Sequence, residues 1–461
     1  MKSLITLEEF FNLPTAEIFN PDSFKGISSI TIDSRKVKKG SLFIAVKGSN
    51  FDGHSFVEEV VSKGASAVLI DKKKLKKFDA IDIPIITVSD TIKALGEIAA
   101  IHRSKSKAIV IAVTGSNGKT GTKEIIKTIC SQKYKTIATT ANNNNHIGVP
   151  LTLLDITPST EVAVVEVGTN HFGEIEYSSA IAQPDIAVIT NIGNSHLEYL
   201  KDKNGVLKEK KALLDATEKR GGTIIINKDD VHLKKIANKY TKVITYSFNA
   251  EASVKAKILE LTASGKTVLS VTGSATEYKS ELNLYGEINA KNVVCALAAI
   301  APLKLNKKQI LDGLKALQAP KQRLNVSTYS GITIIDDTYN ANPESMKSAL
   351  TLLKRISDKK VKLAVLGDMF ELGEEAEKHH RELAKEVKSS GIKELLLIGS
   401  NMKYLAEELS TSKISVMYFE KRNQLKKHLS EYLLLDAAIL FKGSRGMKME
   451  EFIEVLRPIG K

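Results

Sequence analysis

The sequence predicts an α/β protein of three domains, and three observations lead to this prediction. The 461 residues exceed the usual size of one hydrophobic core and suggest about three domains. Short apolar stretches alternate with segments of helical periodicity through most of the chain. Polar and glycine-rich clusters follow several apolar stretches directly, as they do at the carboxyl ends of parallel strands. We expect the domains to cover residues 1–104, 105–317 and 318–461.

A small N-terminal α/β domain is predicted first. Its strands are expected at 28–32, 42–46, 67–70 and 83–88, and its helices near 55–64 and 91–102. The densest lysine run, Lys72–Lys77, has no aromatic side chain that could stack on a base, so we interpret it as a solvent-exposed face. A polar, basic break at 103–107 precedes the next strand.

The second domain is predicted to be of the P-loop ATPase type. Its first strand, 108–114, runs into a glycine-rich turn that ends in Lys119 and Thr120. Such a turn directs backbone N–H groups and one lysine charge at phosphates, and places the threonine hydroxyl on Mg²⁺. The predicted nucleotide-binding residues are Thr114, Gly115, Ser116, Asn117, Gly118, Lys119 and Thr120. Val113 stands at the first glycine position of the general pattern, so a surface turn is the alternative.

Polar side chains follow the later strands of this domain. Glu166 ends the strand 161–167 and could bind or orient Mg²⁺, although it could equally cap a helix. His196 follows the strand 185–190 and is either a metal ligand, a substrate contact or a structural histidine. The run Asn142–Pro150 offers amide donors and acceptors, or forms only a turn. After a strand at 223–226, shorter strands with turn residues are expected at 240–285.

The third domain is predicted to be a Rossmann-like α/β domain with a parallel sheet and helices on both faces. Strands are expected at 332–335, 362–366, 394–398, 414–419 and 437–441. Two polar segments follow strands here: Asp336–Pro343, which could accept from ribose or ammonium, and Lys442–Gly446, which could bind carboxylate or phosphate. Either segment could also be an ordinary polar loop.

Composition limits the partners without choosing one. The net charge of +14 favours anionic partners, which include nucleotides, phosphorylated metabolites, nucleic acids and membrane surfaces. Cys130 and Cys295 fall in apolar helical contexts, so we expect buried thiols in a reducing, cytoplasmic setting. No stretch approaches the about 20 apolar residues of a membrane span, and we expect neither export nor membrane insertion.

Together these segments resemble the Mur ligase family, the ATP-dependent amide-forming enzymes of peptidoglycan and cell-wall synthesis. The segments that carry the resemblance are Asp33–Arg35, Phe51–His54, Asn142–Leu154, Glu166 with Asn170-His171, Asp336–Pro343, Leu366–Gly373 and Lys442–Met447. The most discriminating are Tyr339–Pro343 and Gly367–Met369. They are most similar to the branch that joins D-alanyl-D-alanine to a UDP-N-acetylmuramoyl tripeptide. The resemblance also implies a part in cell shape and cell division.

The resemblance implies a role for each site residue. The UDP part of the substrate would be held in the first domain by Ser34, Arg35, Lys47, Gly48, Asp52 and His54. ATP and Mg²⁺ would be held by Gly118, Lys119, Thr120, Glu166 and His196, with Asn289 and Asn292 at adenine and Arg323 and Asp337 at phosphate and ribose. The remaining substrate contacts would come from Asn142, Asn144, Asn145, Asn340, Asn342, Lys442 and Arg445.

Family members also carry a lysine that captures CO₂ as a carbamate, and the resemblance places it at Lys210, with Lys211 as the alternative. The carbamate would be an anionic oxygen ligand for a second Mg²⁺. Two positions depart from the family pattern. Ile288 replaces a frequent histidine, which removes one ATP contact, and Gly121 replaces a second threonine with little expected effect.

The implied reaction phosphorylates the terminal carboxylate of the tripeptide, after which the dipeptide amine attacks the acyl phosphate. Lys119, Lys210, His196 and Arg323 are the predicted catalytic residues, and Mg²⁺ shares in neutralising the charge. Closure of the three domains around the substrates is expected. A sibling Mur ligase or a folylpolyglutamate synthetase is the alternative within this chemistry. A nucleic-acid-binding NTPase is disfavoured because no base-stacking aromatic run is present. A monomer is the default expectation, and the third peptide residue stays open.

Overall fold

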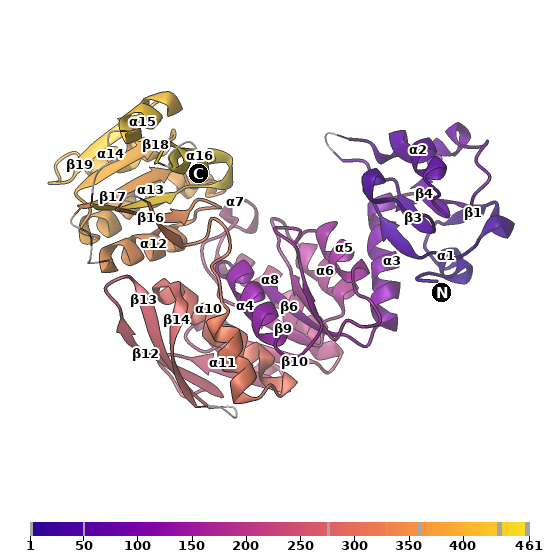
Figure 1. Ribbon diagram of the computed structural model, residues 1–461, viewed down its shortest axis with the longest axis horizontal. Coiled ribbons are helices and arrows are strands. Elements are labelled where there is room, and N and C mark those ends of the chain that lie inside the picture. The colour runs from indigo at the N-terminus through magenta and orange to yellow at the C-terminus, as the bar shows by residue number, and fades with distance from the viewer. Residues whose placement is uncertain are drawn as a thin grey trace. The chain divides into compact units, whose positions relative to one another are not determined.

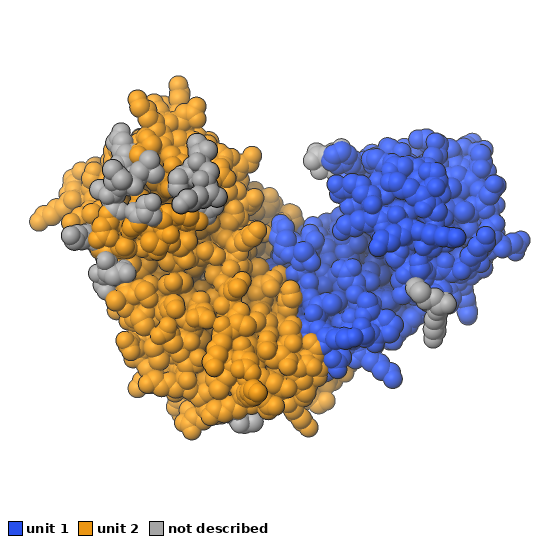
Figure 2. Space-filling view, in the orientation of Figure 1, with its two compact units in different colours: residues 1–112, 135–168, 174–185 blue, residues 113–134, 169–173, 186–461 orange. Residues whose placement is uncertain are grey.

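The computed structural model describes residues 3–48, 51–273, 277–329, 331–356, 359, 361–430 and 436–456, which form three sheets of five, nine and six strands (Figure 1). The chain divides into two compact units (Figure 2). The first unit contains residues 1–112, 135–168 and 174–185, and the second contains 113–134, 169–173 and 186–461. The α/β class and the three-domain architecture predicted from the sequence are confirmed.

The five-stranded sheet of the first unit has the order β1-β5-β4-β3-β2. Its strands are β1 (Glu17–Phe19), β2 (Ser29–Thr31), β3 (Ser41–Ile44), β4 (Ala67–Asp71) and β5 (Ile85–Val88), with α1 (Leu7–Phe11), α2 (Val57–Ser62) and α3 (Thr91–Lys105) packed on it. All pairs are parallel except β1 with β5. Strands β3 and β4 are apolar along their length because two separate cores cover their two faces. The sequence missed β1, an edge strand of three residues.

The strands of the nine-stranded sheet are divided between the two units. The first unit contains β7 (Thr136–Ala138) and β8 (Val162–Glu166), paired in parallel, with α5 (Gly148–Leu154) and α6 (Glu174–Ala182). The second unit contains the order β14-β13-β12-β11-β10-β9, with β9 (Ile186–Ile189), β10 (Thr223–Asn227) and β11 (Val243–Ser247) parallel. Strand β6 (Ile109–Thr114) ends at the glycine-rich turn. The strands expected at 108–114, 161–167, 185–190 and 223–226 are therefore confirmed.

The prediction of shorter strands at 240–285 is wrong for its second half. Strands β12 (Val254–Leu261), β13 (Lys266–Thr272) and β14 (Tyr278–Tyr285) contain eight, seven and eight residues and pair antiparallel. Side chains of β13 alternate between buried and half-buried, so polar residues recur along an uninterrupted strand. In the sequence, polar residues that recur in this way look like the residues of frequent turns, so the strands were expected to be short.

Helices of the second unit surround these strands. They are α4 (Lys119–Cys130), α7 (Leu197–Leu200), α8 (Lys203–Lys219), α9 (Val231–Ile236), α10 (Gly286–Ile300) and α11 (Lys307–Lys315). Helix α10 is buried over most of its surface, which explains its many alanines. The free thiols of Cys130 and Cys295 are both buried, as the sequence predicts.

The six-stranded sheet has the order β15-β16-β20-β17-β18-β19, with β15 (Asn325–Tyr329), β16 (Ile332–Asp337), β17 (Val361–Gly367), β18 (Glu394–Ile398), β19 (Ser415–Phe419) and β20 (Ala437–Lys442). Helices α12 (Pro343–Arg355), α13 (Ala376–Ser389) and α14 (Met402–Glu408) cover one face, and α15 (Arg422–Leu429) and α16 (Glu450–Leu456) cover the other. This is the predicted Rossmann-like arrangement. The sequence missed β15, an antiparallel edge strand.

Two surface features complete the fold. The run Lys72–Lys77 forms a short 3₁₀ helix whose lysines are exposed, as predicted. Among the described residues, the structure contains no helix with the length and hydropathy that crossing a bilayer requires.

Asp368, in one of the discriminating motifs, holds the start of α14. Its side chain is 2% exposed, and its Oδ1 accepts from the backbone N–H groups of Asn401 at 3.0 Å and Met402 at 2.9 Å. The Ser400 hydroxyl lies 3.3 Å from Oδ2. The carboxylate therefore compensates the unpaired amides at the beginning of this segment.

We predict that Asp368→Ala lowers the free energy of unfolding by about 2–3 kcal/mol, because two buried amides lose a charged acceptor. Urea unfolding followed by circular dichroism measures the change, with the exposed Glu375→Gln as the control. An unchanged unfolding midpoint would show that the motif aspartate has no structural role.

Candidate active site

The turn after β6 has the backbone that phosphate binding requires. Gly115 and Gly118 have φ values of 146° and 82°. A Cβ atom at Gly115 would lie 1.9 Å from Thr190 Oγ1, and one at Gly118 would lie 2.3 Å from Asn292 Oδ1. Both positions therefore need glycine, for conformation and for space. Lys119 Nζ donates to the Gly115 carbonyl at 2.8 Å, and the half-buried Thr120 follows at the start of α4.

The loop after β9 is bound to this turn. The Thr190 hydroxyl donates to the Asn117 carbonyl at 2.5 Å, and Asn117 N–H donates to Asn191 Oδ1 at 3.0 Å. The Ser116 hydroxyl accepts from Gly193 N–H at 2.9 Å. These contacts fix the loop that ends in His196, a residue with φ of 54°. A left-handed backbone at a non-glycine residue is typical of functional loops.

Helix α10 packs its two predicted adenine-side asparagines near the same turn. Asn289 Nδ2 donates to the Tyr285 carbonyl at 2.9 Å, and Asn292 Nδ2 lies 3.4 Å from Asn289 Oδ1. A Cβ at Gly121 would lie 2.8 Å from Asn292 Nδ2. Gly121 therefore lies close to α10, and the small effect expected from its replacement of threonine stays a prediction. Ile288 packs against the core of the third domain.

The two candidate lysines on α8 have different surroundings. Lys210 is 1% exposed, and burial, followed by the charge of Lys119, holds its pKa well below the usual value. Lys211 has a side chain that is 31% exposed and forms an ion pair with Asp215. The neighbouring Glu209 accepts from Gly173 N–H at 2.8 Å and so holds the loop 169–173. Only Lys210 offers a buried amine that is favoured in its neutral form.

Glu371 is a residue of this site that the sequence did not single out. Its Oε2 lies 2.7 Å from His196 Nδ1, and its φ is 61°. The adjacent His196 ring lowers the pKa of Glu371 against the effect of burial, and the charge of Lys119 adds to that lowering. Glu371 lies within the motif Leu366–Gly373, but nothing local in the sequence indicates that it faces His196.

The third domain holds two predicted ligand-binding side chains in a buried ion pair. Lys442 Nζ lies 2.5 Å from Asp337 Oδ2 and donates to the Asn340 carbonyl at 2.9 Å. Asp337 Oδ1 accepts from Leu324 N–H at 3.1 Å. Lys442 is 1% exposed and Asp337 is 9% exposed. The Lys442 ammonium thus lies inside the protein, and not at the open loop edge that the sequence predicted.

The asparagines that were predicted to contact the dipeptide also form hydrogen bonds within the protein. Asn342 caps α12, accepting from Ser345 N–H at 2.9 Å, and its Nδ2 donates to Asn117 Oδ1 in the phosphate loop at 2.9 Å. Asn340 Oδ1 accepts from Ala341 N–H at 2.9 Å. Glu344 Oε1, one turn into α12, accepts from Asn194 N–H at 2.9 Å. The beginning of α12 therefore contacts the phosphate loop and the loop after β9.

The other third-domain candidates keep more open surroundings. Arg323 stacks its guanidinium 4.0 Å from the centre of the Tyr339 ring. Arg445 has a side chain that is 55% exposed, and its Nη1 lies 2.8 Å from Glu450 Oε1. A stacked guanidinium and an exposed one are both suited to binding phosphate or carboxylate.

The candidates of the first unit fall into exposed and structural groups. Arg35, 86% exposed at its side chain, pairs with Asp33 at 2.8 Å, which lowers the pKa of Asp33 to about 2. Ser34 begins the same 3₁₀ turn. The His54 ring is buried, with Nδ1 2.6 Å from Asp52 Oδ1 and Nε2 accepting from Asp71 N–H at 3.0 Å. Both ring nitrogens are therefore used within the protein. Lys47 and Gly48 are exposed, and Lys47 pairs with Asp52 in an isolated antiparallel β-bridge of the backbone.

Glu166 also belongs to the first unit. Asn144 Nδ2 donates to Glu166 Oε1 at 2.8 Å, and Asn145 Oδ1 accepts from Gly148 N–H at 2.9 Å. Asn142 is exposed. Thr120, His196 and Lys210 belong to the second unit. In the described parts of the chain, no group of three or more His, Cys, Asp or Glu side chains is arranged to hold a metal ion.

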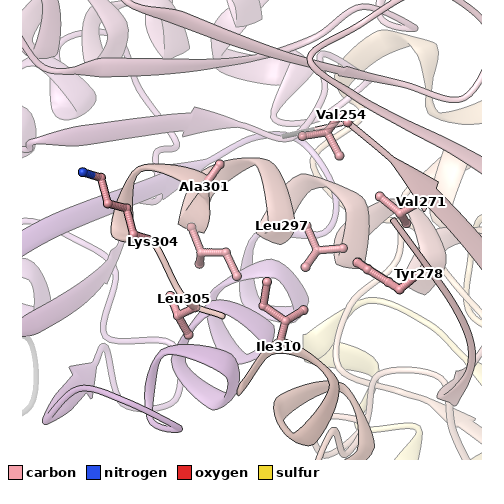
Figure 3. A pocket seen from close by; sticks show the side chains of 10 residues that line it. Val254, Val271, Tyr278, Leu297, Ala301, Lys304, Leu305 and Ile310 are labelled. Carbon is pink, nitrogen blue, oxygen red and sulfur yellow. The ribbon is translucent and has the colours of Figure 1, made fainter. Parts of the chain in front are cut away.

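A separate cavity of about 210 Å³ lies away from these residues (Figure 3). Val254 and Val271 line it from the antiparallel strands, and Leu297 and Ile310 line it from helices α10 and α11. Its walls are mostly apolar. Such a lining cannot bind a triphosphate, so this cavity is not the candidate active site.

We predict that Lys442→Met lowers the free energy of unfolding by about 3 kcal/mol, because the buried Asp337 carboxylate loses its counter-charge. The double variant Lys442→Met/Asp337→Asn should recover much of this loss, while the exposed Arg445→Met should change it by less than about 1 kcal/mol. Chemical unfolding of the three variants and of the parent measures the differences in the free energy of unfolding. Equal stability of Lys442→Met and the parent would contradict the buried pair.

Most of the chain is similar to known proteins. Family models described as the Mur ligase family catalytic domain, the Mur ligase middle domain and the Mur ligase glutamate ligase domain match residues 26–103, 113–300 and 322–445. The UDP-N-acetylmuramoyl-tripeptide–D-alanyl-D-alanine ligase of Bacillus subtilis is 35% identical over 93% of both chains, and that of Escherichia coli is 33% identical over 99% of both.

Solved structures agree with these matches. The crystal structure of MurF from Acinetobacter baumannii superposes with a TM-score of 0.88 at 29% identity, covering 98% of each chain. MurF ligase from Thermotoga maritima in complex with ADP superposes with a TM-score of 0.81 at 27% identity, covering 93% of this chain and 96% of that one. The chain therefore belongs to the Mur ligase family, in the branch of the UDP-N-acetylmuramoyl-tripeptide–D-alanyl-D-alanine ligases.

Proposed function

We propose that the protein joins D-alanyl-D-alanine to a UDP-N-acetylmuramoyl tripeptide in peptidoglycan precursor synthesis, converting ATP to ADP through an acyl phosphate. The observation that carries this proposal is the contact of Asn342, in the branch-specific motif, with Asn117 of the phosphate loop at 2.9 Å. It joins the segment that distinguishes this branch to the segment that binds nucleotide. A sibling Mur ligase or a folylpolyglutamate synthetase is not favoured by the relatives.

The nucleotide is assigned to the second unit. Backbone amides of the turn from Thr114 to Thr120 and the Lys119 ammonium bind the phosphates at the beginning of α4. Asn289 and Asn292 lie on the adenine side, and Arg323 reaches the phosphates. Asp337 accepts from the ribose hydroxyls with the lone pairs that Lys442 and Leu324 do not use. This assignment is supported by the closeness of Asn292 to Gly118.

The cation site is assigned to Thr120, Glu166, His196 and a carbamate on Lys210. Bound Mg²⁺ would neutralise charge on the phosphates and the acyl phosphate. Three of the four donors fit, because hydroxyl, carboxylate and carbamate oxygens are the ligands that Mg²⁺ prefers, and His196 would add an imidazole nitrogen. The buried Lys210 amine, favoured in its neutral form, can attack CO₂ and release one proton, which forms the carbamate. Lys211, paired with Asp215, is a poorer nucleophile.

The tripeptide substrate is assigned mainly to the first unit. The exposed Arg35, with Ser34, Lys47 and Gly48, holds the diphosphate of UDP, and Asp52 and His54 shape that loop through their mutual contact. The further substrate contacts are Asn142, Asn144 and Asn145. We place the domain borders near residues 104 and 317, outside the strands of the three sheets. A monomer remains the expected state.

The proposed activity is tested by phosphate release from ATP and Mg²⁺. We expect turnover only when UDP-N-acetylmuramoyl tripeptide and D-alanyl-D-alanine are both present, with a product whose mass equals their sum less one water. Each substrate alone, and free amino acids in place of the dipeptide, serve as controls. Intact ATP with both substrates, or stimulation by nucleic acid, would contradict the proposal.

A second test asks whether Lys210 or Lys211 carries the carbamate. Lys210→Ala should lower kcat about 100-fold or more, because a charge that stabilises the transition state is lost. Lys211→Ala, which removes only a surface ion pair, should stay within about threefold. Removing dissolved CO₂ should inactivate the parent protein, and bicarbonate should restore it. A severe loss in Lys211→Ala alone would assign the carbamate to Lys211 instead.

A further inference from the structure

The proposed reaction needs a site for a small zwitterion, and the asparagines at the start of α12 do not provide the charges. D-alanyl-D-alanine carries an ammonium group at one end and a carboxylate at the other, separated by no more than about 7 Å. The Asn342 amide group is divided between Ser345 and Asn117, and Asn340 Oδ1 accepts from a backbone amide. Recognition of the ammonium group therefore requires a carboxylate elsewhere.

We propose that Glu371 binds the α-ammonium group of the incoming dipeptide, and that Phe370 and Arg445 complete the site by contacting its methyl groups and its carboxylate. This inference rests on the proposed function and adds the residues that select the acceptor. Glu371 and Phe370 are not among the predicted substrate contacts, and Arg445 is predicted only as a substrate contact of unspecified kind.

The Glu371 carboxylate is accessible and close to the nucleotide site. Its side chain is 44% exposed, although Oε2 lies 2.7 Å from His196 Nδ1. His196 ends the loop that Thr190 and Asn191 bind to the phosphate loop, so Glu371 lies beside the nucleotide-binding loops. An ammonium group bound at Glu371 would thus lie near the phosphates, where the acyl phosphate must form. The left-handed backbone at Glu371 turns this side chain toward His196 and not along the sheet.

Phe370 and Arg445 come from two loops that are bonded to each other. Phe370 N–H donates to the Ser444 hydroxyl at 2.8 Å, and Ser444 N–H donates to the Asp368 carbonyl at 2.9 Å. A Cβ at Gly446 would lie 2.9 Å from the Phe370 ring, so the ring rests on the residue next to Arg445. The loops that carry Glu371, Phe370 and Arg445 are therefore joined, so an anion, an apolar ring and a cation come from neighbouring segments.

The apolar and cationic parts are open to solvent. Phe370 is 43% exposed, which leaves its ring available to a methyl group. The Arg445 side chain is 55% exposed and uses only Nη1 for Glu450 and Gln322. The fork of the remaining N–H groups can bind a carboxylate in bidentate fashion.

The experiment compares Glu371→Gln with Glu375→Gln, an exposed glutamate four residues away that pairs with Lys378. We expect Glu371→Gln to raise KM for D-alanyl-D-alanine about 30-fold, which corresponds to one lost charged hydrogen bond. KM for ATP and for Mg²⁺ should stay within about twofold. The control variant should match the parent protein. An unchanged dipeptide KM in Glu371→Gln would overturn the inference.

Trapping separates recognition of the dipeptide from formation of the acyl phosphate. Hydroxylamine, which is uncharged at neutral pH, converts the acyl phosphate to a hydroxamate without the dipeptide. Glu371→Gln should form hydroxamate at the parent rate, which also shows that the variant is folded. Equal losses in both reactions, or a raised KM for Mg²⁺, would assign Glu371 to the metal site and overturn the inference.

An analogue that lacks the amine tests the charge directly. Propionyl-D-alanine, used as a competitive inhibitor, should bind the parent much more weakly than the dipeptide does, and Glu371→Gln should lose most of that discrimination. If both proteins discriminate equally, the inference fails while the proposed function stands. If the parent makes no amide product at all, the proposed function itself fails.

Discussion

The burial of Lys210 near the charged Lys119 is the constraint on which the proposed active site depends. Lys119 is fixed as a cation by the Gly115 carbonyl at the beginning of α4, where the phosphates need a positive charge. Lys210 is almost fully buried within reach of that charge, and both effects favour its neutral amine. The nearby Glu209 is committed to the loop 169–173. Under the proposed function, the Lys119 charge would serve the phosphates and the buried Lys210 amine would serve the carbamate.

Much of the fold could be predicted because its signals are local. Strands such as β3, β6 and β20 are apolar except for one polar residue at an end, and helices with clear periodicity separate them. The strands that were missed, β1, β7 and β15, lie at sheet edges, where few residues are buried. Strands β12 to β14 were expected to be short because one of their faces is polar, so their sequence does not differ enough from that of turns.

The site was only partly predictable, for a related reason. The phosphate loop is contiguous, and its glycines, lysine and threonine identify it without any partner. The surroundings of Lys442 depend on Asp337, which lies 105 positions away, and those of Glu371 depend on His196 in another domain. A sequence shows that such residues are polar, but it does not show whether they face a ligand or each other. The structure shows that Lys442 is buried against Asp337 and that the Arg445 side chain is exposed.

The third domain contacts the nucleotide-binding loops through polar groups that ligands also need. Asn342 uses Asn117 of the phosphate loop, Glu344 uses Asn194, and Glu371 uses His196. A ligand that takes one of these groups from its partner would replace a protein contact. Its net affinity would then be a difference between two sets of contacts, and its binding would change the position that is favoured for the third domain. Under the proposed function, binding of nucleotide and dipeptide would be coupled through these loops.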